Sequence, residues 1–173
     1  MLNKCHTCKN SELIFCFKTT DYVTEEKFNI FQCQKCNLLF PESYPPNLDV
    51  YYPKKYRSYS RIISKILSIK SFFFVKKINS LFNKEQKKKI LEIGCGKGVM
   101  LEIFKKLDWT VYGKERLEYI EKNDCNISDK SIEMYRDGYF NCILLHNSLE
   151  HLKYPKRILD NLALKLKKKV YLL

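Results

Sequence analysis

The stretch ILEIGCGKG, residues 90–98, holds three of the chain's five glycines within five positions. Its first four residues belong to an apolar segment, KILEI (residues 89–93), that has the length and composition of a buried strand. A helical pattern, VMLEIF, begins directly after Gly98. A glycine-rich bend at the carboxyl end of a strand exposes main chain that a ligand can approach closely. The stretch therefore predicts a ligand-binding turn after the first strand of an α/β sheet.

The residues beyond this turn alternate between strand and helix patterns. Apolar strands are predicted at residues 110–115 and 140–147, and a helix with Pro155 in its first turn precedes a last strand at residues 170–173. This rhythm is typical of parallel strands joined by crossover helices. The fold class predicted for this part of the chain is therefore α/β.

An acidic residue indicates that the ligand of this turn is a nucleoside. Glu115 ends the second predicted strand, 17 residues beyond Gly98, where a carboxylate can accept hydrogen bonds from both ribose hydroxyls. The glycine spacing is not that of a pyrophosphate-binding fingerprint, and Lys97 does not stand in a Gly-Lys-Ser/Thr phosphate loop. A nucleoside cofactor without a diphosphate thus fits better than NAD or ATP.

Two cysteine pairs near the N-terminus predict a zinc site. Cys5 and Cys8, and Cys33 and Cys36, are each separated by two residues, a spacing that lets both sulfurs bind one metal from a tight turn. Four thiolates leave no open coordination position, so the zinc would be structural; free cysteines in a small β unit are the alternative. Two further expectations concern other residues: a left-handed backbone at Asn10 and Asn37, and burial of Cys16, Cys95, Cys125 and Cys142.

Composition divides the chain into three predicted regions: a zinc-binding module with a Pro- and Tyr-rich exit at 1–56, a basic connector helix at 57–88, and a last domain at 89–173. Of the net charge of +13, most lies in residues 57–89, which hold ten basic and one acidic side chain. Confinement of the charge to this segment argues against a nucleic-acid-binding face across the whole protein. Without an apolar run long enough for a membrane span or a signal region, the chain is expected in the cytoplasm.

The connector is predicted to be an amphipathic helix. Ile62, Ile66, Ile69 and Phe73 recur at three- and four-residue steps, which defines one apolar face. We expect this face to pack against the sheet. Peripheral contact of the basic helix with an anionic membrane surface is the alternative.

Taken together, these segments resemble the class I S-adenosylmethionine-dependent methyltransferases, and within them bacterial small-molecule and sugar methyltransferases that carry an N-terminal zinc-binding module. The resemblance rests on the cysteine pairs with their Tyr- and Pro-rich exit and on three further segments, LEIGCGKG, VYGKE and LLHNSLEHLKYP. It implies an incomplete Rossmann-like methyltransferase sheet, strands one to five, preceded by a small four-cysteine zinc-ribbon-like module. The chain departs from the family pattern at Asn141, where aspartate is usual, and it ends before the last helix and two strands expected of the family.

The resemblance also implies site residues and a function, namely methyl transfer from S-adenosylmethionine to a small-molecule acceptor such as a sugar or glycan-linked group. His151 is the first candidate for a catalytic base and His146 the second, although His151 could instead orient its loop through Glu150. Asp129 and Lys130 would lie near the adenine. Residues expected to bind the cofactor are Glu92, Gly94, Cys95, Gly96, Gly98, Glu115, His146 and Asn147, with Ser148 nearby.

Other functions remain open from the sequence. A truncated, non-catalytic remnant or a zinc-dependent interaction module would explain the missing strands, and an RNA methyltransferase would explain the basic connector. The sequence does not identify the acceptor atom or the oligomeric state.

Overall fold

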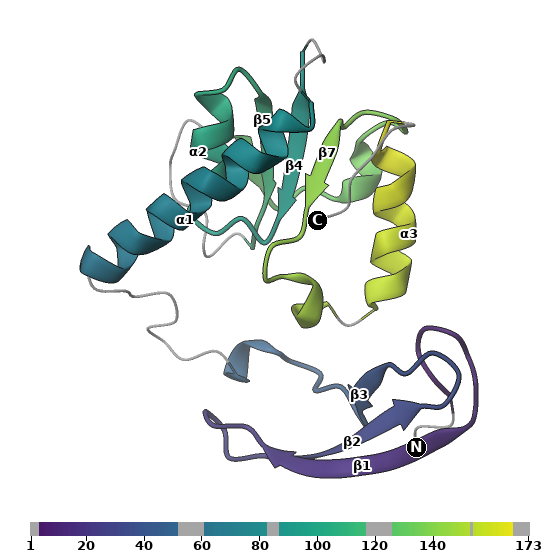
Figure 1. Ribbon diagram of the computed structural model, residues 1–173. Coiled ribbons are helices and arrows are strands. Elements are labelled where there is room, and N and C mark those ends of the chain that lie inside the picture. The colour runs from purple at the N-terminus through teal and green to yellow at the C-terminus, as the bar shows by residue number, and fades with distance from the viewer. Residues whose placement is uncertain (1–3, 52–60, 83–86, 117–125, 153, 168–173) are drawn as a thin grey trace. The chain divides into compact units, whose positions relative to one another are not determined.

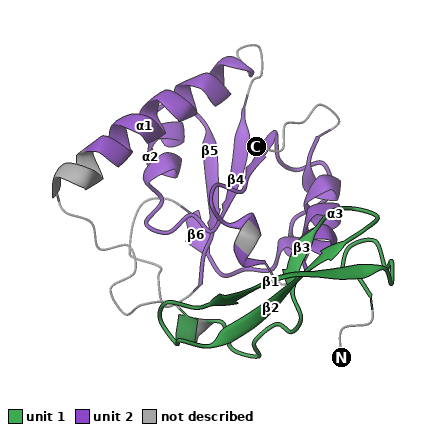
Figure 2. Ribbon diagram, turned by 60° about the horizontal axis from the view of Figure 1, so that its bottom comes forward, with its two compact units in different colours: residues 1–58 green, residues 59–173 purple. Residues whose placement is uncertain are grey.

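The computed structural model describes residues 4–51, 61–82, 87–116, 126–152 and 154–167 (Figure 1). The chain divides into two compact units, Met1–Ser58 and Tyr59–Leu173, which Figure 2 shows in different colours. Among the described residues, no helix combines the length and apolarity needed to cross a membrane.

Unit 1 is built on a three-stranded antiparallel sheet with the order β1-β2-β3. The strands span Leu13–Thr20, Lys27–Cys33 and Leu39–Pro41. Pro41 ends β3, an edge strand, where a missing N–H costs little. A short 3-10 helix, η1 (Asp49–Tyr51), follows.

Unit 2 contains a four-stranded parallel sheet that confirms the predicted α/β fold. Its strands are β4 (Lys89–Ile93), β5 (Thr110–Lys114), β6 (Asn126–Ser128) and β7 (Cys142–Leu144), in the order β6-β5-β4-β7. β6 was not predicted, because three residues of mixed polarity carry no periodic signal. The predicted last strand lies outside the described residues.

Helices cover both faces of this sheet (Figure 1). On one face lie α1 (Arg61–Ser80) and α2 (Val99–Lys105), whose buried residues include Val75, Ile78 and Phe104. On the other face lie α3 (Pro155–Lys165) and the 3-10 helix η3 (Ile132–Met134). Alternate residues of β4 serve the two faces, as a pleated strand requires: Ile90 joins the first core and Leu91 the second.

The helix α1 does not use the face that its sequence suggested. Ile66, Ile69 and Phe73 are 50, 57 and 67% exposed, so the expectation that this face packs against the sheet is wrong for the residues whose side chains are described. Val75 and Ile78 on another face are buried instead. The N-terminal half of α1 extends beyond the sheet in both ribbon views.

A polar contact fixes the buried end of α1 against the sheet. The indole Nε1 of Trp109 donates to Asn79 Oδ1 at 2.7 Å, and Lys88 Nζ donates to the same oxygen at 2.9 Å. Trp109 is almost fully buried and lies between the rings of Phe82 and Phe104. A buried indole N–H needs such an acceptor, because leaving it without one is costly.

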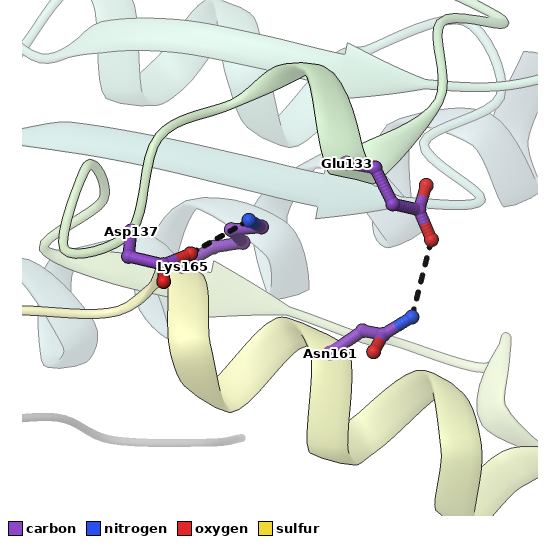
Figure 3. Close-up of polar contacts among 4 residues, drawn as sticks. All are labelled: Glu133, Asp137, Asn161 and Lys165. Carbon is purple, nitrogen blue, oxygen red and sulfur yellow. Dashed lines mark hydrogen bonds and ion pairs between the residues drawn. The ribbon is translucent and has the colours of Figure 1, made fainter.

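The helix α3 is anchored to the segment that precedes β7. Asn161 Nδ2 donates to Glu133 Oε1 at 3.1 Å, and Lys165 Nζ pairs with Asp137 Oδ1 at 2.7 Å (Figure 3). Pro155 occupies the first turn, as predicted. These contacts hold α3 beside the sheet edge at which β7 begins.

Asn141, the departure from the family pattern, has a structural role. Its buried Oδ1 accepts a hydrogen bond from the backbone N–H of Lys89 at 2.9 Å and another from Lys167 Nζ at 3.2 Å. Its own backbone N–H donates to the Lys89 carbonyl at 2.9 Å. An amide oxygen can accept both bonds, so asparagine joins the starts of β4 and β7 at this position.

Candidate functional site

The strand order places a topological switch point between β4 and β7. From β4 the chain proceeds outward through β5 and β6, and it then returns to the other side of β4 to form β7. In open α/β sheets, ligands bind outside the carboxyl ends of the two strands that flank such a switch. The glycine stretch 94–98 and the segment 145–148 follow these two strand ends.

The glycine stretch is a bend that only residues without a side chain adopt easily. Gly94, Gly96 and Gly98 have φ angles of 73°, 55° and 75°, all in the left-handed region. The N–H of Gly94 donates to the carbonyl of Lys114 at 2.8 Å, which ties the bend to the end of β5. A Cβ added to Gly94 would lie 2.8 Å from Ser148 Cβ. The two loops at the switch point therefore pack directly against each other.

Glu115 is directed toward the glycine bend. Its side chain is 8% exposed, and its Oε2 accepts a hydrogen bond from the backbone N–H of Gly96 at 2.6 Å. Oε1 accepts a second bond from the N–H of Arg116 at 3.0 Å. The structure thus places the carboxylate beside the bend, where the sequence predicts a ribose contact.

Two other residues predicted to bind the cofactor have buried side chains. Glu92 is 3% exposed near the end of β4. Cys95 points toward β5, because a Cβ added to Gly113 would lie 2.6 Å from its Sγ. The side chain of Cys95 is therefore part of the apolar core, and only its main chain belongs to the bend.

The segment after β7 forms the second wall of the site. His146 is exposed, and its ring lies 5.3 Å from that of Phe74 on α1. Asn147 is exposed and has a left-handed backbone, with φ 53°. The 3-10 helix η4 (Leu149–His151) follows and ends at the exposed His151, whose backbone N–H donates to the Ser148 carbonyl at 3.2 Å.

Ser148 has a feature that the sequence did not reveal. It is 6% exposed, and its Oγ has no hydrogen-bond partner among the described residues. A buried hydroxyl without a partner is unfavourable in the free protein, so its presence beside Gly94 indicates a site for a polar ligand group. The only sequence signal was its position shortly after a buried strand.

Asp129 and Lys130 lie next to the carboxyl end of β5. Lys114 Nζ donates to both of their backbone carbonyls, at 2.8 and 2.9 Å. The structure thus brings together, along one edge of the sheet, Glu115, the glycine bend, Ser148 and the 129–130 segment.

In unit 1, the four cysteines form one cluster. The sulfur atoms of Cys5, Cys8, Cys33 and Cys36 all lie within 4.8 Å of one another. Cys5 Sγ is 3.6 Å from Cys36 Sγ, and Cys8 Sγ is 3.4 Å from Cys33 Sγ. Four sulfurs at ~2.3 Å from a tetrahedral zinc ion would be separated by about 3.8 Å, so this arrangement fits the ion.

The two cysteine pairs have equivalent backbone conformations. The N–H of Lys9 donates to the Cys5 carbonyl at 3.0 Å, and the N–H of Asn37 donates to the Cys33 carbonyl at 2.9 Å. The left-handed residues are Lys9 and Asn37, so the expectation of a left-handed backbone at Asn37 is confirmed and that at Asn10 is wrong. In each pair the bend falls on the residue directly after the second cysteine.

The pKa of Cys33 favours a thiolate at neutral pH. Desolvation raises this pKa, but hydrogen bonds from the backbone N–H groups of Cys36 and Lys35 and from neighbouring thiols lower it to about 6. Outside the cluster, Cys95 and Cys142 are buried as predicted, whereas Cys16 is exposed and that expectation is wrong. Cys125 lies outside the described residues.

Comparison with solved structures shows the same fold in methyltransferases. The plantazolicin methyltransferase BpumL, solved with a monoazolic desmethylPZN analog and SAH, is 22% identical with a TM-score of 0.53; the match covers 63% of this chain and 48% of that chain. A putative S-adenosyl-L-methionine-dependent methyltransferase from Methanococcus maripaludis is 16% identical with a TM-score of 0.52; the match covers 64% and 58%. The chain thus spans about half the length of these structures.

A search of curated proteins found no match. The family model for a methyltransferase domain matches residues 65–173, which include the glycine bend, Glu115 and the segment after β7. This match covers more than half of the chain, and the chain therefore belongs to the methyltransferase domain family.

Proposed function

We propose that the protein binds S-adenosylmethionine at the glycine bend and transfers its methyl group to a small-molecule acceptor, of the sugar or glycan-linked type. The observation that carries the proposal is the bond between Glu115 and the N–H of Gly96 at the switch point of the sheet. It places a carboxylate and bare main chain side by side, which is the combination that a nucleoside requires.

The residues at the bend fit an adenosine-bearing cofactor. The Glu115 carboxylate would accept hydrogen bonds from the ribose hydroxyls, and the buried Ser148 hydroxyl would contact a polar group of the ligand. The bend and its flanks (Glu92, Gly94, Cys95 through its main chain, Gly96 and Gly98) would line the methionine and ribose side, and His146 and Asn147 the opposite wall.

The protein's task in such a transfer is mainly alignment. The cofactor supplies a methyl group on a sulfonium that is already an activated leaving group. The residues around the site then have to orient the acceptor and exclude water. For a hydroxyl or amine acceptor, His151 would take the proton, with His146 as the second candidate.

We further propose that Cys5, Cys8, Cys33 and Cys36 hold one structural zinc ion in unit 1. The distances between the sulfurs and the equivalent conformations of the two pairs support this assignment. Complete coordination by thiolates leaves no position for a substrate, so the ion would stabilise unit 1 rather than take part in chemistry.

Calorimetric titration of the full chain with S-adenosylhomocysteine tests the cofactor site. Glu115→Ala should weaken binding roughly 10- to 100-fold, because hydrogen bonds to a charged group contribute about 1.5–3 kcal/mol. Glu102→Ala, which removes an exposed carboxylate from α2, should leave the affinity unchanged. Absence of binding by the unsubstituted protein would contradict the proposal and favour the zinc-dependent interaction module.

A further inference from the structure

The helix α1 carries apolar side chains on two opposite faces. Phe74, Val75 and Ile78 point toward the core of unit 2. Ile66, Ile69 and Phe73 are each at least half exposed, and we call them the outer stripe. At about 100° per residue, the outer stripe occupies an arc of about 60°, roughly 150° away from the buried face. A helix that is apolar on both sides has a second surface to cover.

The outer stripe forms a row of exposed apolar side chains rather than isolated ones. Its three side chains recur at steps of three and four residues, and all three are exposed. Scattered exposed apolar residues need no explanation, but a continuous row of them marks an interaction site.

Lysines border the outer stripe on both sides. Lys70 and Lys77 lie on one border and Lys76 on the other, each within about 70° of its centre on the helical projection, and all three are exposed. Lys76 Nζ lies 5.6 Å from the centre of the Phe72 ring. Residues 57–84 contain seven basic and no acidic residues. The charge along this segment is therefore of one sign.

The apolar stripe and the lysines beside it together indicate the chemistry of the partner. A phosphate-rich nucleic acid would neutralise the lysines but leave the apolar row in water. A second copy of α1 would cover the row but bring like charges together, which is unfavourable. A bilayer with anionic headgroups satisfies both groups, because the row can enter the headgroup boundary while long lysine side chains reach the phosphates.

We propose that the outer stripe of α1 and its bordering lysines dock the protein on an anionic lipid bilayer. The helix would lie in the plane of the surface, with the outer stripe toward the acyl chains and the buried face still on the sheet. This inference does not depend on methyl transfer: it concerns where the protein acts, and it stands or fails by lipid binding alone.

Co-sedimentation of the full chain with vesicles tests the proposal. With vesicles of phosphatidylcholine containing about one-third phosphatidylserine, the bound fraction should exceed that with phosphatidylcholine alone by about tenfold at low salt, and it should fall as salt is raised. Equal binding to the two kinds of vesicle, or no binding to either, would overturn the proposal.

Substitutions distinguish insertion of apolar side chains into the bilayer from electrostatic attraction to its surface. Phe73→Gln and the double variant Lys70→Gln/Lys77→Gln should each reduce binding severalfold. Their matched controls, Leu164→Gln on α3 and Lys105→Gln/Lys106→Gln at the end of α2, also remove exposed side chains and should bind as the unsubstituted protein does. Because all of these positions are exposed, the variants should retain the thermal transition of the parent.

Two results would contradict the assignment. If Phe73→Gln binds vesicles as tightly as its parent while the lysine variant does not, the attraction is only electrostatic. If sedimentation without vesicles reveals a dimer that Phe73→Gln abolishes, a second copy covers the stripe.

Discussion

The hydroxyl of Ser148 lies buried beside Gly94 and has no hydrogen-bond partner among the described residues. Ser148→Ala should therefore leave the free protein as stable as its parent or slightly more stable, because it removes an unsatisfied polar group. The same change should weaken binding of S-adenosylhomocysteine about three- to tenfold. Thermal unfolding and calorimetric titration measure the two effects.

The control for Ser148→Ala is Ser80→Ala. The Ser80 hydroxyl donates to the Lys77 carbonyl at 2.7 Å, so its loss should slightly destabilise the protein and leave ligand binding intact. A large fall in stability in Ser148→Ala would show that the hydroxyl serves the free protein and not a ligand.

Substitutions at Gly94 and Gly138 allow the energetic cost of backbone strain to be separated from that of a close contact. Both have positive φ, but a Cβ at Gly94 would lie 2.8 Å from Ser148 Cβ, whereas a Cβ at Gly138 would meet nothing within 4 Å. Gly138→Ala should reduce the free energy of unfolding by about 1 kcal/mol, and Gly94→Ala by an additional 1–3 kcal/mol or so. Urea denaturation measures both. Equal losses of unfolding free energy in the two variants would show that the cost comes from backbone conformation alone.

Individual site residues differed in how far the sequence could predict their positions. Glu115 and the glycines lie at neighbouring strand ends, as the sequence predicted, because parallel strands bring their carboxyl ends to one edge, whatever the details of packing. Burial of Cys95 was also predicted, but its contact with the space left by Gly113 on the neighbouring strand was not, because a local pattern does not define that contact. The exposure of Cys16 also depends on a tertiary surface that local pattern does not define.

Among the elements, α1 shows why periodicity alone can select the wrong face. Its outer stripe and its buried residues both recur at helical steps, so the sequence contains two valid apolar faces. Only the position of the sheet decides which one is buried. The strands β3 and β6 escaped prediction for another reason, since three residues are too few to establish a period.

Two isoleucines on α1 test the orientation of the helix. Ile78→Ala should lower the free energy of unfolding by about 2–4 kcal/mol, because the side chain is fully buried in the core. Ile69→Ala should change it by less than about 0.5 kcal/mol, because the side chain is exposed. Chemical denaturation of both variants measures the difference. Comparable losses would mean that the outer stripe is covered by protein.

At the scale of the whole molecule, two units of different construction share one chain. The sequence identified the cysteine cluster from its spacing and the parallel sheet from its rhythm, because both signals are local and repeated. The separate roles proposed for the units lead to different responses to metal removal. A chelator should unfold unit 1 and leave the sheet of unit 2 intact.

The proposed zinc ion should also be lost in acid. The Cys33 thiol, with a pKa of about 6, is ionised at neutral pH and becomes protonated below that value, so protons compete with zinc as the pH falls. Metal analysis should find one zinc per chain at neutral pH, and a competing chelator dye should detect increasing release as the pH is lowered.

Serine variants provide the comparison for the zinc site. Cys33→Ser should abolish binding, whereas Cys16→Ser, at an exposed position outside the cluster, should retain one ion per chain. Retention of zinc by Cys33→Ser would contradict the assignment of the four ligands.

The placement of Trp109 gives the molecule an internal reporter. It is the chain's only tryptophan, and it is buried between α1, α2 and the sheet of unit 2. Its fluorescence emission will therefore shift to the red when that core opens to water, while events confined to the cysteine-rich unit leave the spectrum unaltered. The opening of unit 2 can thus be followed by itself, without any added dye.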